Sequence, residues 1–191
     1  MRPQKVKDEH LMRGLISVLR AKGYEGASLM DLANATGLKK ASLYHRFPGG
    51  KQQMVEEVLK FIGNWSEEHI YGVLTNKQLN IEERLLRSIA NINALYDDGK
   101  SACILKALTS DANLLNLDSQ IKQSFQRWIE GFEILGVDAG FTKDQSIQYA
   151  QEVIIRIQGS LILSKGLNST APFQEQLGQI KTLYSKASPI H

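Results

Sequence analysis

The stretch LMDLANATGLKKASLYHRFPGGK, residues 29–51, decides the fold of the N-terminal part of the chain. It opens with apolar residues at the spacing of one buried helical face: Leu29, Leu32 and Ala33. Ser28 stands directly before them as a candidate N-cap. Gly37 follows four residues after Ala33, at a point where a sharp turn needs a positive φ. The stretch therefore predicts a short helix that ends in a tight turn.

A second short helix is predicted over residues 39–46. Leu43 and Phe47 form its inner face, and Pro48 ends it because the residue before a proline is pushed out of the helical region. Its outer face carries cations, hydrogen-bonding groups and one small residue: Lys39, Lys40, Ala41, Ser42, Tyr44, His45 and Arg46. The two helices and their turn have the spacing of a helix-turn-helix, and the outer face suits insertion into a DNA major groove.

The run GLKKASLYHRFPGGKQQM, residues 37–54, resembles the end of the DNA-binding domain of the TetR family of bacterial repressors. The family pattern is matched by Gly37, Leu43, Tyr44, Phe47 and Lys51, and upstream by Gly23-Tyr24 and Ala27-Ser28-Leu29. About fifty residues are covered. The resemblance implies a ligand-responsive homodimeric repressor of a palindromic operator. The expected DNA contacts are Ser28, Thr36, Lys39, Lys40, Ala41, Ser42, Tyr44, His45 and Lys51. In this set Lys39, Lys40, Ser42 and His45 lie at or near bases, while Thr36, Tyr44 and Lys51 contact the backbone.

Composition is that of an ordinary globular chain with a basic N-terminal third. Of 191 residues, 42% are apolar and 23% are charged. Residues 1–60 carry eleven lysines and arginines against six acidic residues, which fits a nucleic-acid-binding head on a slightly acidic body. The single cysteine, Cys103, favours a reducing compartment. No apolar run is long enough for a membrane span and no secretion signal is evident, so a cytoplasmic protein without membrane association is expected.

The chain as a whole reads as all-α, with about nine helices. A three-helix DNA-binding domain is predicted over residues 1–50, and an α-helical ligand-binding and dimerisation domain over 51–191. Outside the helix-turn-helix, the expected helices are Gln4–Lys22, Lys51–Leu74, Glu82–Asp98, Ala102–Leu115, Asp118–Gly136, Thr142–Leu167 and Pro172–Lys186. Near the start, Arg2, Lys5 and Lys7 either contact phosphate or form a solvated end.

The last two helices are the candidates for dimerisation. Apolar stripes run along both, and the expected interface residues are Ile147, Ile154, Ile157, Leu161, Phe173, Leu177, Ile180 and Tyr184. Gly159 and Ser160 are small enough for a partner backbone to approach closely. The alternative, that these stripes are the core of a monomer, stays open.

An effector pocket is expected between the helices of the body, lined mainly by apolar and aromatic groups. The candidates are Trp65, Tyr96, Cys103, Phe125, Trp128, Phe132 and Gln158, each of which is alternatively plain core. Three segments also resemble a TetR subgroup that includes drug-efflux regulators responding to aromatic compounds: Ala102-Cys103, Phe125 to Trp128, and Gly159 to Leu161.

The sequence offers no convincing catalytic or metal chemistry. The four histidines lack partners at metal-ligand spacing, and Gly49-Gly50-Lys51 lacks the spacing of a nucleotide loop. No metal, no cofactor and no enzymatic activity are predicted. Two rival hypotheses remain: a small-molecule binding protein with a scaffolding helix-turn-helix, and an enzyme that uses Cys103 or a histidine.

Overall fold

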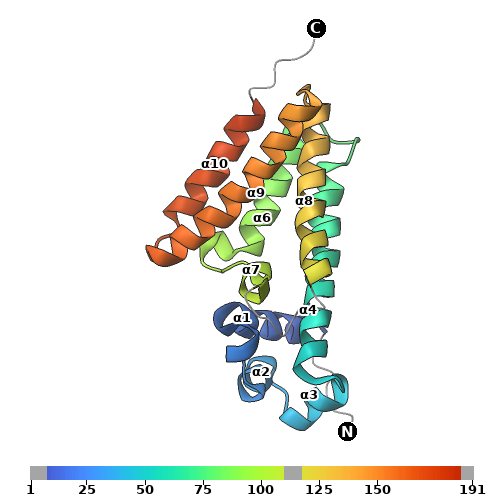
Figure 1. Cartoon of the computed structure of the whole chain (residues 1–191), viewed down its shortest axis with the longest axis vertical. Coiled ribbons are helices and arrows are strands. Elements are labelled where there is room, and N and C mark those ends of the chain that lie inside the picture. The colour runs from blue at the N-terminus through green and yellow to red at the C-terminus, as the bar shows by residue number, and fades with distance from the viewer. Residues whose placement is uncertain (1–7, 110–117, 186–191) are drawn as a thin grey trace. The chain divides into compact units, whose positions relative to one another are not determined.

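The computed structural model describes residues 8–109 and 118–185, and these residues form helices and turns without any strand (Figure 1). The chain divides into two compact units. The first contains the described residues of Met1–Ile62 and Ile104–Ile121, and the second those of Gly63–Cys103 and Lys122–His191. Since three consecutive helical segments run on from Gly50 to Leu74 as one helix, the described part of the chain has nine helices besides one 3-10 turn. The all-α prediction is confirmed.

The first unit is built from five helical segments. They are α1 (Asp8–Gly26), α2 (Leu29–Thr36), α3 (Lys40–Arg46), most of α4 (Gly50–Ser66) and α7 (Ile104–Thr109). The predicted boundary at residue 50 differs from this division, because the first turns of α4 and the distant α7 both pack into the first unit.

A small apolar core holds the first unit together. Its buried side chains include Leu11, Leu15, Leu19, Leu32, Met54, Val55, Val58 and Leu108. Leu11, Leu15 and Leu19 recur every four residues along α1, so one face of that helix is fully covered. The start of the expected helix Gln4–Lys22 lies outside the described residues, and so do Arg2, Lys5 and Lys7. The end of the expected helix Ala102–Leu115 also lies outside them.

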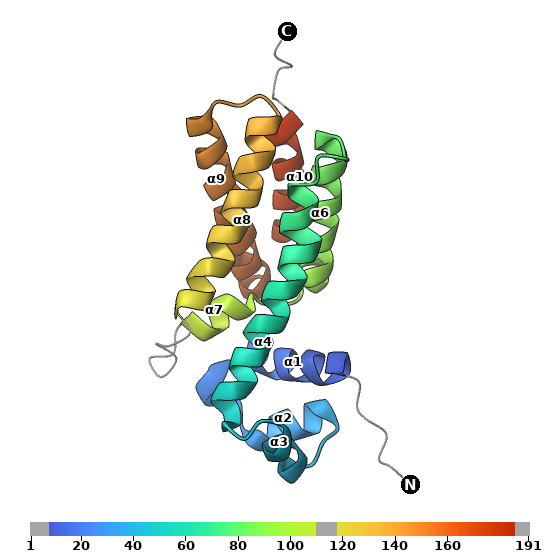
Figure 2. The same ribbon diagram turned by 90° about the vertical axis from the view of Figure 1, so that its right-hand side faces the viewer.

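The second unit is a bundle of long helices, which Figure 2 shows aligned along a common direction. Its segments are the end of α4, η1 (Glu67–Tyr71), α5 (Gly72–Leu74), α6 (Ile81–Leu95), η2 (Asp97–Gly99), most of α8 (Asp118–Asp138), α9 (Lys143–Gly166) and α10 (Ala171–Ser185). Two capping boxes fix helix starts. Asn80 with Glu83 opens α6, and Thr142 with Gln145 opens α9 as predicted.

A π-helical turn joins α4 to α5 within one continuous helix. Arg127 from α8 donates to both carboxylate oxygens of Glu67, at 2.7 and 2.8 Å, and its guanidinium lies 3.2 Å from the centre of the Tyr71 ring. The guanidinium lowers the pKa of the Glu67 carboxyl, because it donates to the charged form. The turn is therefore held at both ends by one side chain of a neighbouring helix.

Within the described ranges, no helix combines the length and the apolar character that crossing a bilayer requires.

Candidate nucleic-acid interface

The start of α2 is fixed by a hydrogen-bonded cluster of three residues. The Ser28 hydroxyl accepts from the Asp31 backbone N–H at 3.1 Å, and the Asp31 carboxylate accepts from the Ser28 N–H at 3.1 Å. Lys22 of α1 donates to the same carboxylate at 2.7 Å. The bond from Lys22, with those from Ser28, lowers the pKa of Asp31 from 3.8 to about 2. Ser28 is exposed at the surface, as its predicted DNA contact requires, but its hydroxyl already serves the cap.

The turn between α2 and α3 depends on Gly37, which has φ of 67°. Its N–H donates to Asn34 O at 3.3 Å, and the N–H of Leu38 donates to Ala33 O at 3.1 Å. These two bonds satisfy carbonyls that the end of α2 would otherwise leave unpaired. A side chain at residue 37 would strain the backbone, so glycine sets the direction in which the chain leaves α2.

Thr36, predicted to contact the DNA backbone, lies inside the first unit. Its side chain is fully buried, and its hydroxyl donates to Leu32 O at 2.8 Å. This prediction was wrong, because the last turn of α2 directs residue 36 toward α1 rather than toward solvent. The Thr36 methyl group lies 3.1 Å from the position that a Cβ on Gly14 of α1 would take.

Helix α3 presents one buried and one exposed face. Leu43 is fully buried and Phe47 nearly so, which seats the helix on the unit. The other side chains face solvent, and they are the predicted contacts Lys39, Lys40, Ala41, Ser42, Tyr44 and His45, together with Arg46. Two of these are cations at the start of the helix, and Tyr44 is 47% exposed. We call this surface, residues 39–42 and 44–46, the reading face.

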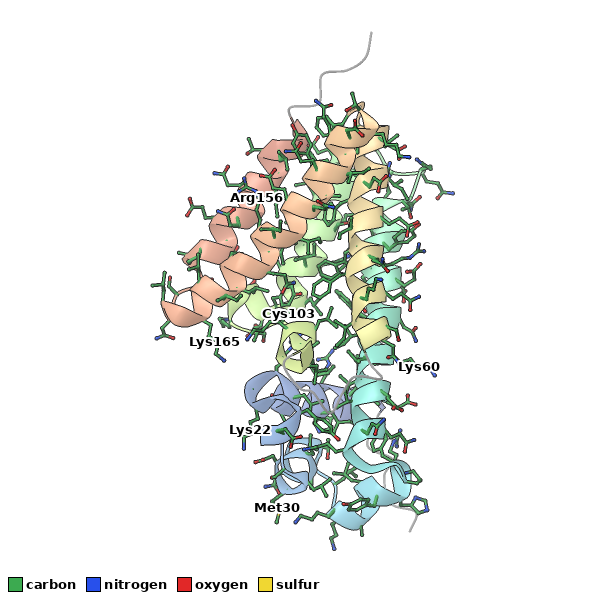
Figure 3. The ribbon with its side chains drawn as sticks, in the orientation of Figure 1. Lys22, Met30, Lys60, Cys103, Arg156 and Lys165 are labelled. Atoms are coloured by element: carbon green, nitrogen blue, oxygen red, sulfur yellow. The ribbon has the colours of Figure 1, made fainter. Side chains whose placement is uncertain are left out.

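Met30 was not among the predicted contacts. It is 52% exposed and projects from the first turn of α2 (Figure 3). Its position between Leu29 and Leu32, off the apolar stripe, was the signal in the sequence that it faces outward.

Lys51, predicted to contact phosphate, makes its contacts within the first unit instead. Its ammonium donates to Tyr24 O at 2.6 Å and to Ala27 O at 3.2 Å. The same nitrogen lies 4.3 Å from the centre of the Tyr24 ring. Two of its three N–H groups therefore donate to backbone carbonyls, whereas the sequence predicted that the ammonium contacts a DNA phosphate. The Gly49 N–H, at the start of α4, donates to the Gln53 side chain at 2.8 Å.

Three of the predicted effector-binding residues meet in the second unit. Gln158 of α9 donates to the Tyr96 hydroxyl at 3.4 Å, and that hydroxyl donates to the Cys103 sulfur at 3.6 Å. Cys103 is buried. The rings of Tyr96 and Phe173 pack edge to face, with their centres 5.9 Å apart.

The other four predicted effector-binding residues are separate aromatic side chains. Trp65 stacks on His69 with ring centres 4.7 Å apart, and Phe125 is half-buried. Trp128 is buried, and Phe132 is fully buried with its carbonyl accepting from the Tyr184 hydroxyl at 3.0 Å. The described residues contain no group of three or more histidine, cysteine or acidic side chains placed to hold a metal ion.

The predicted dimer stripe is buried within one chain. Helices α9 and α10 pack on each other (Figure 1), and they enclose the side chains of Ile154, Ile157, Leu161, Phe173, Leu177, Ile180 and Tyr184, while Ile147 is half-buried. Burial also raises the pKa of Tyr184. Seven of these side chains are covered within one chain, so the apolar periodicity that marked them is that of the core, while the half-buried Ile147 stays a predicted interface residue. The apolar side chains left outside on or directly after α9 are Ile155, Ile162, Leu163 and Leu167.

A short basic helix, seated by two buried apolar side chains and aimed by a glycine turn, defines a helix-turn-helix DNA-binding protein. Residues 11–58 match the family model described as bacterial regulatory proteins, tetR family. The chain belongs to this family of transcriptional regulators, which are not enzymes.

Curated relatives support the same assignment, and a solved structure shares the fold. An uncharacterized HTH-type transcriptional regulator of Bacillus subtilis, YxaF, is 22% identical over 182 residues, which cover 93% of this chain and 95% of the relative. The biofilm operon icaADBC HTH-type negative transcriptional regulator IcaR of Staphylococcus aureus is 29% identical over 101 residues, 46% of this chain and 54% of that protein. A TetR transcriptional regulator from Legionella pneumophila has the same fold, with a TM-score of 0.79 at 20% identity over 95% of this chain and 98% of that one.

Proposed function

We propose that the protein is a homodimeric repressor that binds a palindromic DNA operator in the cytoplasm and leaves it when a small hydrophobic or aromatic effector binds. The observation that carries the proposal is the reading face, an exposed set of basic and hydrogen-bonding side chains on α3 above the buried Leu43. The negative regulation named for the relative IcaR favours repression over activation.

On the reading face, the residues have different tasks. Lys39 and Lys40 stand at the N-terminal end of α3, where a helix in the major groove comes nearest to base edges. Ser42 and His45 carry hydrogen-bonding tips, and the small Ala41 lets the backbone approach closely. Tyr44 reaches outward to a phosphate oxygen. Ser28, whose hydroxyl caps α2, contributes at most a secondary backbone contact.

The dimer is proposed to form through the outward faces of α9 and α10. Ile155 is 71% exposed and Ile162 is 58% exposed, and they lie two turns apart on α9. Gly159 lies between them, and Gly178 lies on α10; an added Cβ at either residue would meet nothing within 4 Å. Glycine inside a helix costs up to ~1 kcal/mol relative to alanine, and no neighbour among the described residues of the chain explains these two. Close approach of a partner helix does explain them.

The effector site is proposed around Tyr96, Cys103 and Gln158, where a hydroxyl, a thiol and an amide meet beside the Phe173 ring. A few convergent polar groups among aromatic walls are typical of small-molecule sites. An effector that binds one conformation better than another would shift the protein away from the form that fits the operator. The resemblance to drug-efflux regulators favours an aromatic compound.

Selection of bound DNA from a random pool tests the proposal most broadly. We expect a palindromic site with two half-sites about one helical turn apart, because two copies of α3 must enter successive major grooves. Replacing Lys39 and Lys40 together with alanine should abolish the enrichment. A matched control, alanine at the exposed Lys122 and Lys143 of the second unit, should preserve it. Equal affinity of the wild-type protein for random and selected DNA would contradict the proposal.

A further inference from the structure

Lys51 lies at a particular point in the topology of the first unit. The helix-turn-helix segment begins directly after Ala27 and ends at Phe47, three residues before α4 starts. Lys51 is in the first turn of α4, and its ammonium donates to the carbonyls of Tyr24 and Ala27. One side chain therefore joins the two ends of the whole reading segment, residues 28–47.

The contacts are well suited to an ammonium group. The regular part of α1 ends at Gly23, whose φ of 68° and ψ of −174° turn the chain out of the helix. Tyr24 lies in the last turn of α1 beyond this kink and Ala27 directly follows α1, so both carbonyls stand near the negative end of that helix. An ammonium offers three N–H donors, and here two donate to these carbonyls while the charge faces the Tyr24 ring at 4.3 Å.

We propose that Lys51 is a positioning residue that aims the reading face from inside the protein and is not a phosphate contact. It fixes the segment before α2 to the first turn of α4, and so closes the base of the loop that carries α2 and α3. Without this tie, the loop gains conformational freedom that DNA binding must then remove. The effect on DNA affinity rests on the proposed function, but the hydrogen bonds of Lys51 to Tyr24 O and Ala27 O are a property of the free protein.

The two roles predict different salt dependence. A lysine on a phosphate releases a counterion, so its loss lowers the slope of log K against log salt by about 0.9. A lysine that positions the reading face leaves the number of phosphate contacts unchanged. Lys51→Met removes the N–H donors and the charge but keeps the apolar stem. Lys40→Met makes the same change at a residue proposed to lie near base edges, and it serves as the matched comparison.

The test combines DNA titrations with hydrogen exchange of the free protein. For Lys51→Met we expect operator affinity at least about 10-fold weaker, random-sequence affinity within about 2-fold, and a salt slope equal to that of the wild type. Lys40→Met should instead weaken the preference at one base pair of each half-site, because Lys40 is proposed to lie near base edges. In the free protein, amides of residues 28–47 should exchange at least about 10-fold faster in Lys51→Met, while those of α9 keep their wild-type rates.

Either of two results would overturn the inference: a salt slope that falls by about 0.9 for Lys51→Met, or unchanged exchange over residues 28–47. If Lys51→Met does not fold, Tyr24→Leu removes the ring that faces the Lys51 ammonium and leaves both backbone carbonyls in place, and a smaller acceleration of the same amides is expected. A wild-type protein without operator preference would refute the proposed function instead, and the exchange data would still decide whether Lys51 holds the segment.

Discussion

Gly14 of α1 is the position where the first unit should tolerate substitution least. A Cβ built on Gly14 would lie 2.5 Å from Ala35 O, 2.9 Å from Ala35 C and 3.1 Å from the Thr36 methyl group. Since Cβ atoms essentially never approach closer than 3.0 Å, Gly14→Ala must move α1 and α2 apart by at least about 0.5 Å. Two of the three atoms belong to the backbone, so rotating a side chain cannot relieve the clash.

The expected cost follows from two opposing effects. Overpacking a close contact destabilises by about 1–3 kcal/mol, and the backbone contact places Gly14→Ala at the upper end. Alanine is up to ~1 kcal/mol better than glycine inside a helix, which offsets part of this. The net loss should be about 2 kcal/mol, a factor of about 30 in the ratio of folded to unfolded protein.

Urea denaturation followed by far-UV circular dichroism measures this effect. With a slope of about 2 kcal/mol per molar, the midpoint for Gly14→Ala should fall by about 1 M. Gly63→Ala is the matched control, because Gly63 lies inside α4 and its Cβ would meet nothing within 4 Å. It should raise the stability by up to ~1 kcal/mol. If both substitutions raise the midpoint equally, the close packing of α1 on α2 is refuted.

Three further predictions concern the cap, the dimer and the seat of α3. Lys22→Met should raise the pKa of Asp31 from about 2 toward 3.8 in a carboxyl NMR titration, because Lys22 is its main hydrogen-bond donor; an unmoved pKa would contradict this. The lowered pKa means that Asp31 stabilises the fold fully above about pH 4 and loses this contribution as the pH falls toward about 2. Ile162→Glu should convert the proposed dimer to a monomer in light scattering, whereas Lys143→Glu, also exposed on α9, should not; a dimer that survives Ile162→Glu would exclude the outward face of α9 as the interface. Leu43→Ala, at a fully buried site, should destabilise by about 2–5 kcal/mol in denaturation experiments, and a loss below about 1 kcal/mol would argue against the seating of α3.

The sequence predicted the helix-turn-helix because its determinants are local. Ser28 caps α2 through Asp31, and Gly37 makes the left-handed turn. Leu43 and Phe47 occupy the buried face that their spacing required. Thr142 with Gln145 was recognisable for the same reason, since both partners of a capping box lie within four residues.

The errors arose where a side chain meets residues distant in the sequence. The periodicity of α9 showed that it has apolar residues on more than one side, but Ile157 and Leu161 could not be assigned to the core before the packing of α10 was known. Likewise, nothing near Lys51 in the sequence indicated that its ammonium reaches Tyr24 O, which is 27 residues away. The place of α7 in the first unit also depends on contacts that no local pattern encodes.

The central claim, that the exposed side chains of α3 read DNA bases, is tested most directly by selecting bound DNA with single variants of the reading face. Lys40→Ala, Ser42→Ala and His45→Ala are compared with Ser17→Ala, an exposed serine of α1. For at least one of the three we predict relaxed preference at one base pair in each half-site, worth about 1–3 kcal/mol, with the remaining positions and the Ser17→Ala profile unchanged. Uniform weakening at every position in all three variants, or wild-type preference in all three, would contradict the claim.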